Sequence, residues 1–401
     1  MPKTETITFM NREGVPLAAR LDYALGAHRG WAVFAHCFTC SKDSLAAARV
    51  AQYLAMEGIG VLRLDFTGLG QSEGSFEDTG FTANIDDIVA AAAWLEDNYA
   101  APDLLIGHSL GGAAVLAAAA SVPSVRGVAT IGAPADPAHV RHLFADAIPA
   151  IEAIGIAEVV IGGRPIRIGK SFVDDLLAQD APAVLARLQA DLLVMHAPED
   201  EIVKIDNATR IFAAARHPKS FVSLDTADHL LTRKKDSAFA AKVIAAWASR
   251  CLGDELGGDE AGRAGSDPEA VLVRSSPDGI FAHDISIGTH RLRVDEPARI
   301  TGGLDSGPAP YDFLKAGLGA CTAITIRLVA QRKGWPLENC EVEVLHRKEG
   351  EGKEKKDIFS RRLVLEGALD ESQRDYLFDI ANKCPVHRTL EAEADIETEL
   401  Q

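Results

Sequence analysis

The chain has 401 residues, of which 47% are hydrophobic and 25% charged, and its net charge is −17. This length exceeds what one hydrophobic core usually serves, so we expect two domains, and the composition excludes disorder on a large scale. The acidic balance argues against binding to nucleic acid or to an anionic membrane, because both depend on clustered Lys and Arg.

The chain begins without the pattern of a secretory signal, because the polar residues 1–5 lead straight into a strand pattern. Its apolar stretches, such as the Ala-rich residues 113–120, are too short to span a bilayer. We therefore expect a cytoplasmic protein with no membrane partner.

From residue 31 onward, short apolar runs alternate with helical patterns, which is typical of a parallel sheet covered on both faces. Residues 6–9 and 17–23 flank a turn and predict an antiparallel hairpin at the first edge of that sheet. The sequence therefore predicts an α/β fold. The expected strands are residues 31–38, 60–66, 103–107, 128–133, 192–197 and 221–224, and the expected helices are residues 44–57, 83–99, 109–121 and 237–250.

Between residues 134 and 188 the alternation stops, and helical pieces with a hairpin near 162–163 are expected instead. An insertion between two late strands predicts a cap over the site, with a purely structural connection as the alternative.

Residues 253–267 hold five glycines and five acidic residues, a composition that predicts a flexible linker. We therefore expect a first domain over residues 1–252 and a second over residues 268–401.

Beyond the linker the pattern changes to strands separated by two helices, which predicts a smaller α+β domain. The expected strands are residues 270–274, 280–287, 291–294, 340–346, 358–365 and 392–397, and the expected helices are residues 311–333 and 371–383.

A G-x-S-x-G motif stands at residues 107–111, after an apolar strand and before an Ala-rich helix. In that context the sharp turn exposes the serine at the carboxyl end of the strand, and the flanking glycines permit close packing. Ser109 is therefore the predicted nucleophile. The alternative is an ordinary helix start with Ser109 as its N-cap.

A serine nucleophile needs a base, and the base needs an orienting carboxylate. His229 lies in a loop after the last predicted strand of the first domain, and Asp200 lies in the loop that follows strand 192–197. Glu199 and Glu201 are alternatives to Asp200, and a solvated acidic loop without a catalytic role is another.

The negative charge that develops on an ester carbonyl oxygen is met by backbone N–H groups. Leu110 directly follows the nucleophile and is one expected donor. The loop after the first parallel strand supplies the other, which we assign to Phe38. His36 and His108 are expected to shape the site rather than to carry protons.

The six cysteines are too few for a disulfide framework, and a buried structural thiol is the favoured interpretation of each. Residues 37 and 40 form a C-x-x-C, for which metal or redox use is the alternative. No second Cys/His pair has zinc-finger spacing, so we expect neither a metal nor a cofactor. The cysteines are Cys37, Cys40, Cys251, Cys321, Cys340 and Cys384.

Residues 1 to about 252 resemble α/β-hydrolases of the esterase and serine-aminopeptidase type. The resemblance is carried by the G-H-S-L-G motif at Ser109, by the D-x-x-G-x-G-x-S loop at residues 65–72, and by Asp200 and His229. Residues 36–37 read His-Cys where that family usually has His-Gly.

Residues from about 270 to 401 resemble the OsmC/Ohr family of organic-hydroperoxide-resistance proteins, in the segments 307–322 and 381–387. In that family a first cysteine attacks the peroxide and a second resolves it as a disulfide, at the interface of an intertwined dimer. By position these cysteines are Cys321 and Cys384. Tyr311 stands where the family has an acidic residue, and the sequence assigns no particular arginine to the family's Arg.

The combined pattern predicts a carboxylesterase that acts on small acyl esters through a Ser-His-Asp triad, as a homo-oligomer held together by the second domain. A cysteine-based peroxidase with an accessory hydrolase domain is the alternative. A binding module with both sites decayed is a third interpretation, which the complete triad set disfavours. The sequence leaves open the natural substrate, the acyl length and the choice among ester, thioester and amide.

Overall fold

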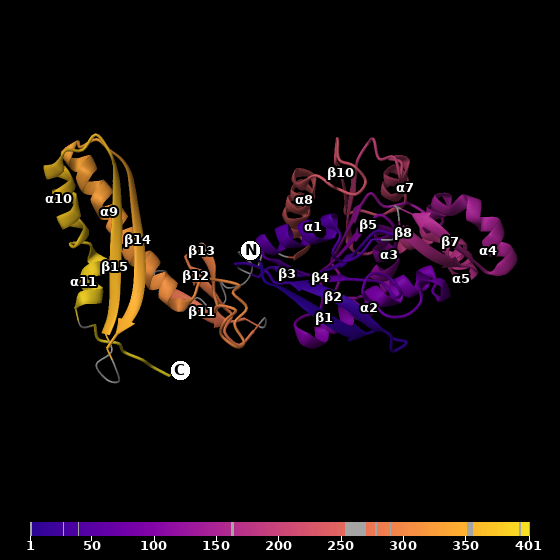
Figure 1. The fold of residues 1–401 in the computed structure, drawn as a ribbon, viewed down its shortest axis with the longest axis horizontal. Helices are drawn as coiled ribbons and strands as arrows, with labels where there is room; N and C mark the ends of the chain where they lie inside the picture. The colour runs from indigo at the N-terminus through magenta and orange to yellow at the C-terminus, as the bar shows by residue number, and fades with distance from the viewer. Residues whose placement is uncertain are drawn as a thin grey trace. The chain divides into compact units, whose positions relative to one another are not determined.

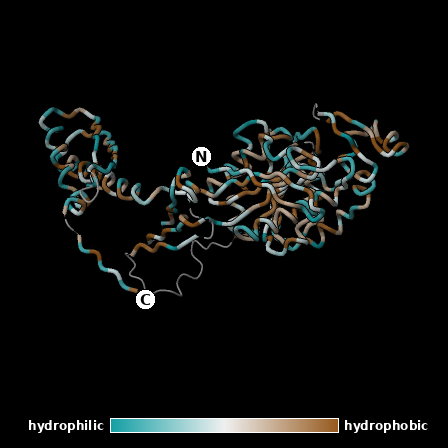
Figure 2. The backbone as a smooth tube through the Cα atoms, turned by 60° about the horizontal axis from the view of Figure 1, so that its bottom comes forward, coloured by the Kyte–Doolittle hydropathy of each residue, from teal (hydrophilic) through white to brown (hydrophobic). Residues whose placement is uncertain are grey.

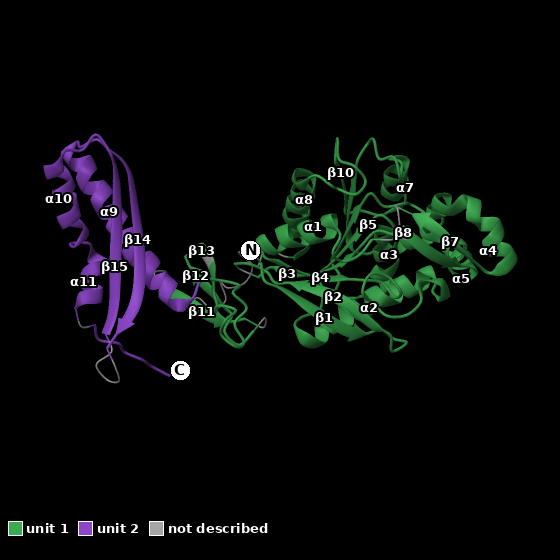
Figure 3. Ribbon diagram, in the orientation of Figure 1, with its two compact units in different colours: residues 1–307 green, residues 308–401 purple. Residues whose placement is uncertain are grey.

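The structure is a computed structural model that describes residues 2–26, 28–38, 40–161, 164–252, 270–276, 279–288, 290–350, 356–392 and 394–400 (Figure 1). The chain divides into two compact units, Met1–Gly307 and Pro308–Gln401, which Figure 3 colours separately. The predicted linker, residues 253–267, lies outside the described residues. The domain boundary drawn there from the sequence therefore stays a prediction.

An eight-stranded sheet forms the centre of the first unit, in the order β1-β2-β4-β3-β5-β6-β9-β10. From β4 to β10 neighbouring strands are parallel, whereas β2 pairs antiparallel with both β1 and β4. The predicted α/β fold class is confirmed. The strands are β1 (Thr4–Met10), β2 (Pro16–Asp22), β3 (Gly30–Ala35), β4 (Ile59–Leu64), β5 (Leu104–His108), β6 (Gly127–Ile131), β9 (Asp191–His196) and β10 (Lys219–Ser223).

Helices cover both faces of this sheet, so its central strands are buried at every position and consist mainly of hydrophobic residues (Figure 2). Adjacent residues of a strand face opposite sides, and accordingly Val33 and Phe34 belong to two different hydrophobic cores. One core includes α2 and α3, and the other includes α1 and α8. The helices are α1 (Leu45–Met56), α2 (Phe81–Asn98), α3 (Leu110–Ala118), α7 (Asp206–Ala214) and α8 (Lys234–Leu252), with the short 3₁₀ helices η1 (Phe76–Asp78) and η2 (Ala119–Ser121).

The segment between β6 and β9, where a cap is expected, folds into helices and one antiparallel hairpin. Its buried side chains, among them Phe144 and Phe172, belong to the same core as α2 and α3. The turn of the hairpin lies outside the described residues. The elements are η3 (Pro137–Ala147), α4 (Ile148–Ile154), β7 (Ile156–Ile161), β8 (Arg164–Gly169), α5 (Lys170–Ala178) and α6 (Ala181–Arg187).

The second unit contains a long helix, a two-stranded hairpin and two further helices, with a small core that includes Ile326 and Leu377. A three-stranded antiparallel sheet, β11-β12-β13, precedes it and is grouped with the first unit. The elements are β11 (Val271–Ser275), β12 (His283–Ile287), β13 (His290–Val294), α9 (Pro310–Lys333), β14 (Leu337–Glu349), β15 (Lys356–Gly367), α10 (Glu371–Ala381) and α11 (Pro385–Glu391).

The strand predicted at residues 392–397 is wrong. A short helix, α11, begins at Pro385, and residues 394–400 form neither strand nor helix. Proline at the first helical position and Cys384 as N-cap favour a helix start here, whereas alternation of apolar and acidic residues alone suggested a strand.

Helix α9 is long and apolar enough to cross a membrane by length and composition alone, and only 22% of its apolar window is buried. The prediction that no apolar stretch has this length was therefore wrong for α9.

Candidate active site

The serine of the G-x-S-x-G motif occupies a sharp turn between β5 and α3. Its backbone has φ 55° and ψ −125°, a strained conformation for a residue with a side chain. A Cβ on Gly107 would collide with the backbone of Gly111, and one on Gly111 would collide with the backbone of Ala35 and His36. The flanking glycines are therefore required by close packing. The Ser109 side chain makes no N-cap hydrogen bond, which leaves its hydroxyl available for another partner.

Three side chains form a hydrogen-bonded chain at the carboxyl ends of β5 and β9 and in the loop after β10. His229 Nε2 lies 2.9 Å from Ser109 Oγ, and His229 Nδ1 lies 2.7 Å from Asp200 Oδ2. Asp200 is buried, whereas Glu199 and Glu201 are exposed. The structure thus brings Ser109, His229 and Asp200 together and leaves the two rival carboxylates in solvent.

Asp200 is held as an anion by its surroundings. Burial by itself would raise the pKa of the Asp200 carboxyl, but the hydrogen bond with His229 and backbone N–H groups outweigh it and lower that pKa. The N–H groups of Ile202 and Val203 donate to Asp200 Oδ1 at 2.9 and 2.8 Å. The ring of His229 is therefore oriented by a charged and rigidly held carboxylate.

His108 orients the loop of His229 from the other side. Its Nε2–H donates to the carbonyl oxygen of His229 at 2.6 Å. Burial, followed by the nearby charge of His229, lowers the pKa of His108 to about 3. His108 thus stays neutral and acts as a donor to the backbone, in keeping with the shaping role expected of it.

Ser109 and His229 open into a cleft of about 390 Å³. Apolar side chains from the capping segment, Leu143 and Ile161, line it together with Ile202 and Leu230. The two residues expected as oxyanion donors lie next to it, since Phe38 lines the cleft and Leu110 directly follows Ser109.

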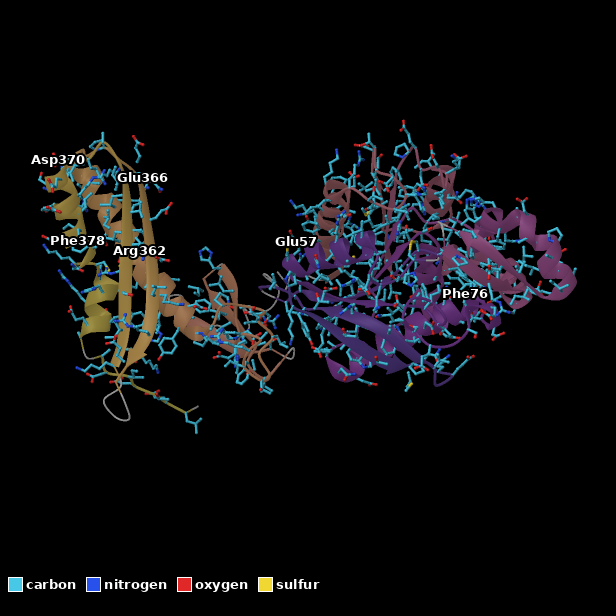
Figure 4. The ribbon with its side chains drawn as sticks, in the orientation of Figure 1. Glu57, Phe76, Arg362, Glu366, Asp370 and Phe378 are labelled. Atoms are coloured by element: carbon cyan, nitrogen blue, oxygen red, sulfur yellow. A yellow bond between two sulfur atoms is a disulfide. The ribbon has the colours of Figure 1, made fainter. Side chains whose placement is uncertain are left out.

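The ring of Phe38 packs against the capping segment. It stacks on Phe172, with ring centroids 5.5 Å apart and planes 9° apart, and contacts Phe76 at 5.7 Å. Phe76 is labelled in Figure 4. The stacking on Phe172 joins the loop that carries the expected oxyanion donor to the segment between β6 and β9.

A buried ion pair holds the end of this loop, and sequence reasoning missed it. Lys42 Nζ lies 2.8 Å from Asp65 Oδ2, and the Lys42 backbone N–H donates to Asp65 Oδ1 at 2.6 Å. Both side chains are fully buried. Asp65 opens the D-x-x-G-x-G-x-S loop, and a Cβ on Gly70 would collide with its carboxylate. That loop therefore encloses Asp65, which in turn fixes Lys42.

Cys37 and Cys40 are joined by a disulfide, so their interpretation as buried free thiols was wrong. A turn in which the Cys40 N–H donates to the Cys37 carbonyl at 3.0 Å brings their Cα atoms to 5.2 Å, within disulfide reach. Both cysteines line the cleft of Ser109.

In the second unit Cys321 and Cys384 are neighbours: the Cys321 thiol is among the groups that lower the pKa of Cys384, and Cys384 Sγ lies 3.7 Å from the hydroxyl of Thr322, the residue after Cys321. Sequence reasoning could not assign an arginine here, and the structure supplies Arg361. Its guanidinium donates to Thr322 Oγ1 at 2.9 Å and lies 3.0 Å from His387 Nδ1. Within the described ranges no group of three or more His, Cys, Asp or Glu side chains is arranged to hold a metal ion.

Comparison with known proteins matches the two parts of the chain to two different families. Residues 26–157 match the family model of serine aminopeptidase S33, and residues 303–399 match that of OsmC-like proteins. A monoacylglycerol lipase of Mycolicibacterium smegmatis is 28% identical over 208 residues, which are 44% of this chain and 72% of that protein.

Two solved structures have the fold of the first unit. The esterase domain of a Rhodothermus marinus protein is 47% identical, with a TM-score of 0.53, and covers 63% of this chain and 100% of its own. Est1E of Butyrivibrio proteoclasticus with bound ferulic acid is 18% identical, with a TM-score of 0.51 over 61% of this chain and 99% of its own, and supports the fold alone. The chain therefore belongs to the α/β-hydrolases through its first part and to the OsmC-like proteins through its last, as a fusion of the two.

Proposed function

We propose that the chain is a carboxylesterase that cleaves small acyl esters with Ser109, His229 and Asp200 as its triad. The observation that carries this proposal is the continuous set of hydrogen bonds from Asp200 through His229 to Ser109. The 47% identity to the Rhodothermus marinus esterase domain supports it.

The proposed reaction is an acyl transfer in two halves. His229 Nε2 accepts the proton of Ser109 while Ser109 Oγ attacks the ester carbonyl, and the N–H groups of Phe38 and Leu110 donate to the resulting oxyanion. His229 then gives its proton to the departing alcohol. A water molecule, deprotonated by the same imidazole, releases the acid from the acyl-enzyme. Asp200 stabilises the imidazolium in both halves.

The cleft favours short aliphatic acyl groups, because its lining is apolar and its volume is about 390 Å³. On a series of p-nitrophenyl esters we expect the highest kcat/KM for short acyl chains. The kcat/KM for butyrate should exceed that for palmitate by at least about tenfold, because acyl carbons that extend beyond the cleft add little binding free energy. The measurement is the initial rate of p-nitrophenol release by the full chain. Hydrolysis that is absent from the whole series, or fastest for palmitate, would contradict the proposal.

A second candidate function, the reduction of organic hydroperoxides, is favoured by the surroundings of Cys384. Burial would raise the pKa of the Cys384 thiol, but the N–H of His387, the Thr322 hydroxyl, the Cys321 thiol and the Arg361 charge together lower it. A hydroperoxide would oxidise the two thiols to a Cys321–Cys384 disulfide, giving one alcohol and one water.

Arg361→Gln is expected to raise the pKa of Cys384, because the thiolate loses a nearby cation. The alkylation rate of Cys384 by iodoacetamide, followed by mass spectrometry against pH, should shift its midpoint upward. Arg361→Lys should restore part of the shift. The control is Arg362→Gln, which removes the adjacent exposed arginine (labelled in Figure 4) and should leave the midpoint unchanged. Equal midpoints for all three variants and the unaltered chain would rule out this role for Arg361.

We also propose that the OsmC-like part forms a homodimer. Large apolar side chains are exposed on several of its elements: Ile324 of α9 is 66% exposed, Leu345 of β14 57%, and Phe378 of α10 (labelled in Figure 4) 60%. An isolated two-stranded sheet is only marginally stable in water. We therefore propose that a second copy of the chain packs against β14 and β15 and buries these apolar side chains.

The full chain is therefore expected to elute as a dimer or a higher even-numbered oligomer. Light scattering coupled to size-exclusion chromatography at micromolar concentration measures this directly. A chain shortened to the hydrolase part should be monomeric. A monomeric full chain under the same conditions would refute the proposed dimer.

A further inference from the structure

A disulfide lies in the wall of the cleft that holds Ser109. The cleft is lined by both Cys37 and Cys40 as well as by Ser109 and His229. Cys37 is 3% exposed and Cys40 is half-buried, so the Cys40 sulfur is the more accessible of the two. The disulfide and the nucleophile therefore open into the same cleft.

The disulfide closes the turn that carries Phe38. The loop is held on one side by His36, whose Nδ1–H donates to the Cys37 carbonyl at 2.7 Å, and on the other by the buried Lys42–Asp65 pair. Between the His36 hydrogen bond and the Lys42–Asp65 pair, the Cys37–Cys40 bond constrains the turn covalently. The backbone N–H of Phe38 lies inside the ring that this bond closes.

Such a short ring contributes little to the stability of the whole domain. The loop entropy that a cross-link removes from the unfolded chain grows with the number of residues enclosed, and here the cysteines are only 3 positions apart. The effect of the bond is therefore local, on the geometry of the turn. In the part of the chain that the structure describes, the other four cysteines are free thiols.

We propose that Cys37 and Cys40 form a thiol–disulfide exchange site inside the cleft, that its substrate is a small dithiol, and that its oxidation state sets the rate of ester hydrolysis. This inference rests on the proposed function, because it assigns the oxyanion donor to Phe38. The disulfide form is the active one, since it adds a covalent constraint to a turn that is otherwise closed by the hydrogen bond from the Cys40 N–H to the Cys37 carbonyl.

One thiolate of the dithiol attacks Cys40 Sγ, the Cys37–Cys40 bond breaks, and Cys37 leaves as a thiolate. The second thiolate of the reagent attacks the reagent's own sulfur in the mixed disulfide and expels Cys40 as a thiolate. The protein gains two electrons and, on protonation, two protons, while the dithiol becomes a cyclic disulfide. The same steps in reverse restore the Cys37–Cys40 bond.

The probe is dithiothreitol, applied to the full chain, with its cyclic oxidised form for the reverse reaction. Reduction should lower kcat on p-nitrophenyl butyrate by at least about tenfold, with a smaller change in KM, because an oxyanion donor acts on the transition state. The oxidised reagent should restore the rate. The double variant Cys37→Ser/Cys40→Ser should hydrolyse p-nitrophenyl butyrate at the low rate of the reduced chain, and neither reagent should change that rate. Cys340→Ser should respond to both reagents as the unaltered chain does.

A second measurement tests the location of the exchange. Sulfonylation of Ser109 by phenylmethylsulfonyl fluoride places a benzyl group in the cleft that the disulfide lines, so dithiothreitol should then reduce Cys37–Cys40 at least about tenfold more slowly, as followed by differential alkylation and mass spectrometry. Equal hydrolysis by the oxidised and fully reduced forms overturns this inference alone, as does reduction that sulfonylation leaves unchanged. Absence of hydrolysis from both forms overturns the proposed function together with it.

Discussion

Ser109→Ala is expected to lower kcat for ester hydrolysis by roughly a thousandfold to a millionfold, the range typical of a lost triad nucleophile. The reason is local: Ser109 Oγ is the group within hydrogen-bonding distance of His229 Nε2, and no second hydroxyl of the cleft has such a bond among the described residues. The measurement is kcat for p-nitrophenyl butyrate, together with loss of labelling by a fluorophosphonate.

The fold of this variant should be intact. Alanine at a strained turn keeps the side-chain volume small, so the melting temperature should change by only a few degrees. Thr232→Ala, which removes another hydroxyl residue of the same cleft, is the matched control and should retain fluorophosphonate labelling. Full turnover by Ser109→Ala would show that the nucleophile lies elsewhere.

Asp65→Asn is expected to lower the free energy of unfolding by about 3–5 kcal/mol, because it leaves the ammonium group of Lys42 buried without its main counter-charge. Asp65 accepts hydrogen bonds from Lys42 Nζ, from the Lys42 backbone and from the Gln71 backbone, whose N–H lies 2.9 Å away. An amide offers one acceptor oxygen and turns an NH₂ group toward these donors. Urea denaturation of the full chain measures the loss.

Asp43→Asn is the control for this prediction. Asp43 also binds Lys42 Nζ, at 3.0 Å, but its side chain is 45% exposed, so its loss should cost less than about 1 kcal/mol. Asp65→Asn should also lower kcat, since Lys42 ends the loop that carries Phe38. If the two variants unfold at the same urea concentration, the buried pair does not have the role assigned to it.

The sequence was sufficient to predict the elements that depend on local pattern. The buried strands of the large sheet were visible as apolar runs, and Ser109 stood in a motif that requires a strand before it and a helix after it. From the sequence, Asp200 could be preferred over Glu199 and Glu201 as the carboxylate that orients His229 only by its position in the loop. Its burial, against the exposure of Glu199 and Glu201, goes with the way the loop folds around its carboxylate, which accepts from the N–H groups of Ile202 and Val203 and pairs with His229.

Contacts between distant segments could be predicted only where a motif marked both partners, as for Ser109 and His229, and not elsewhere. The Lys42–Asp65 pair joins residues from two loops, and neither residue has a local pattern that marks it as buried. Arg361 lies on β15 and reaches Thr322 of α9, 39 positions away, beside an exposed arginine of the same type. Only the pleat of the strand, which sends adjacent side chains to opposite faces, distinguishes Arg361 from Arg362.

The capping segment enters and leaves the fold at two neighbouring parallel strands. β6 and β9 are paired along their length, Gly127 with Asp191 and Ile131 with Met195, so both ends of the segment are fixed by the sheet. The groups proposed for chemistry lie outside it, while Leu143 and Ile161 of the cleft lie within it. Residues 137–187 are thus a natural unit for exchange between homologues, by which selectivity for the acyl group could diverge, in evolution or in the laboratory, while the reaction itself is conserved.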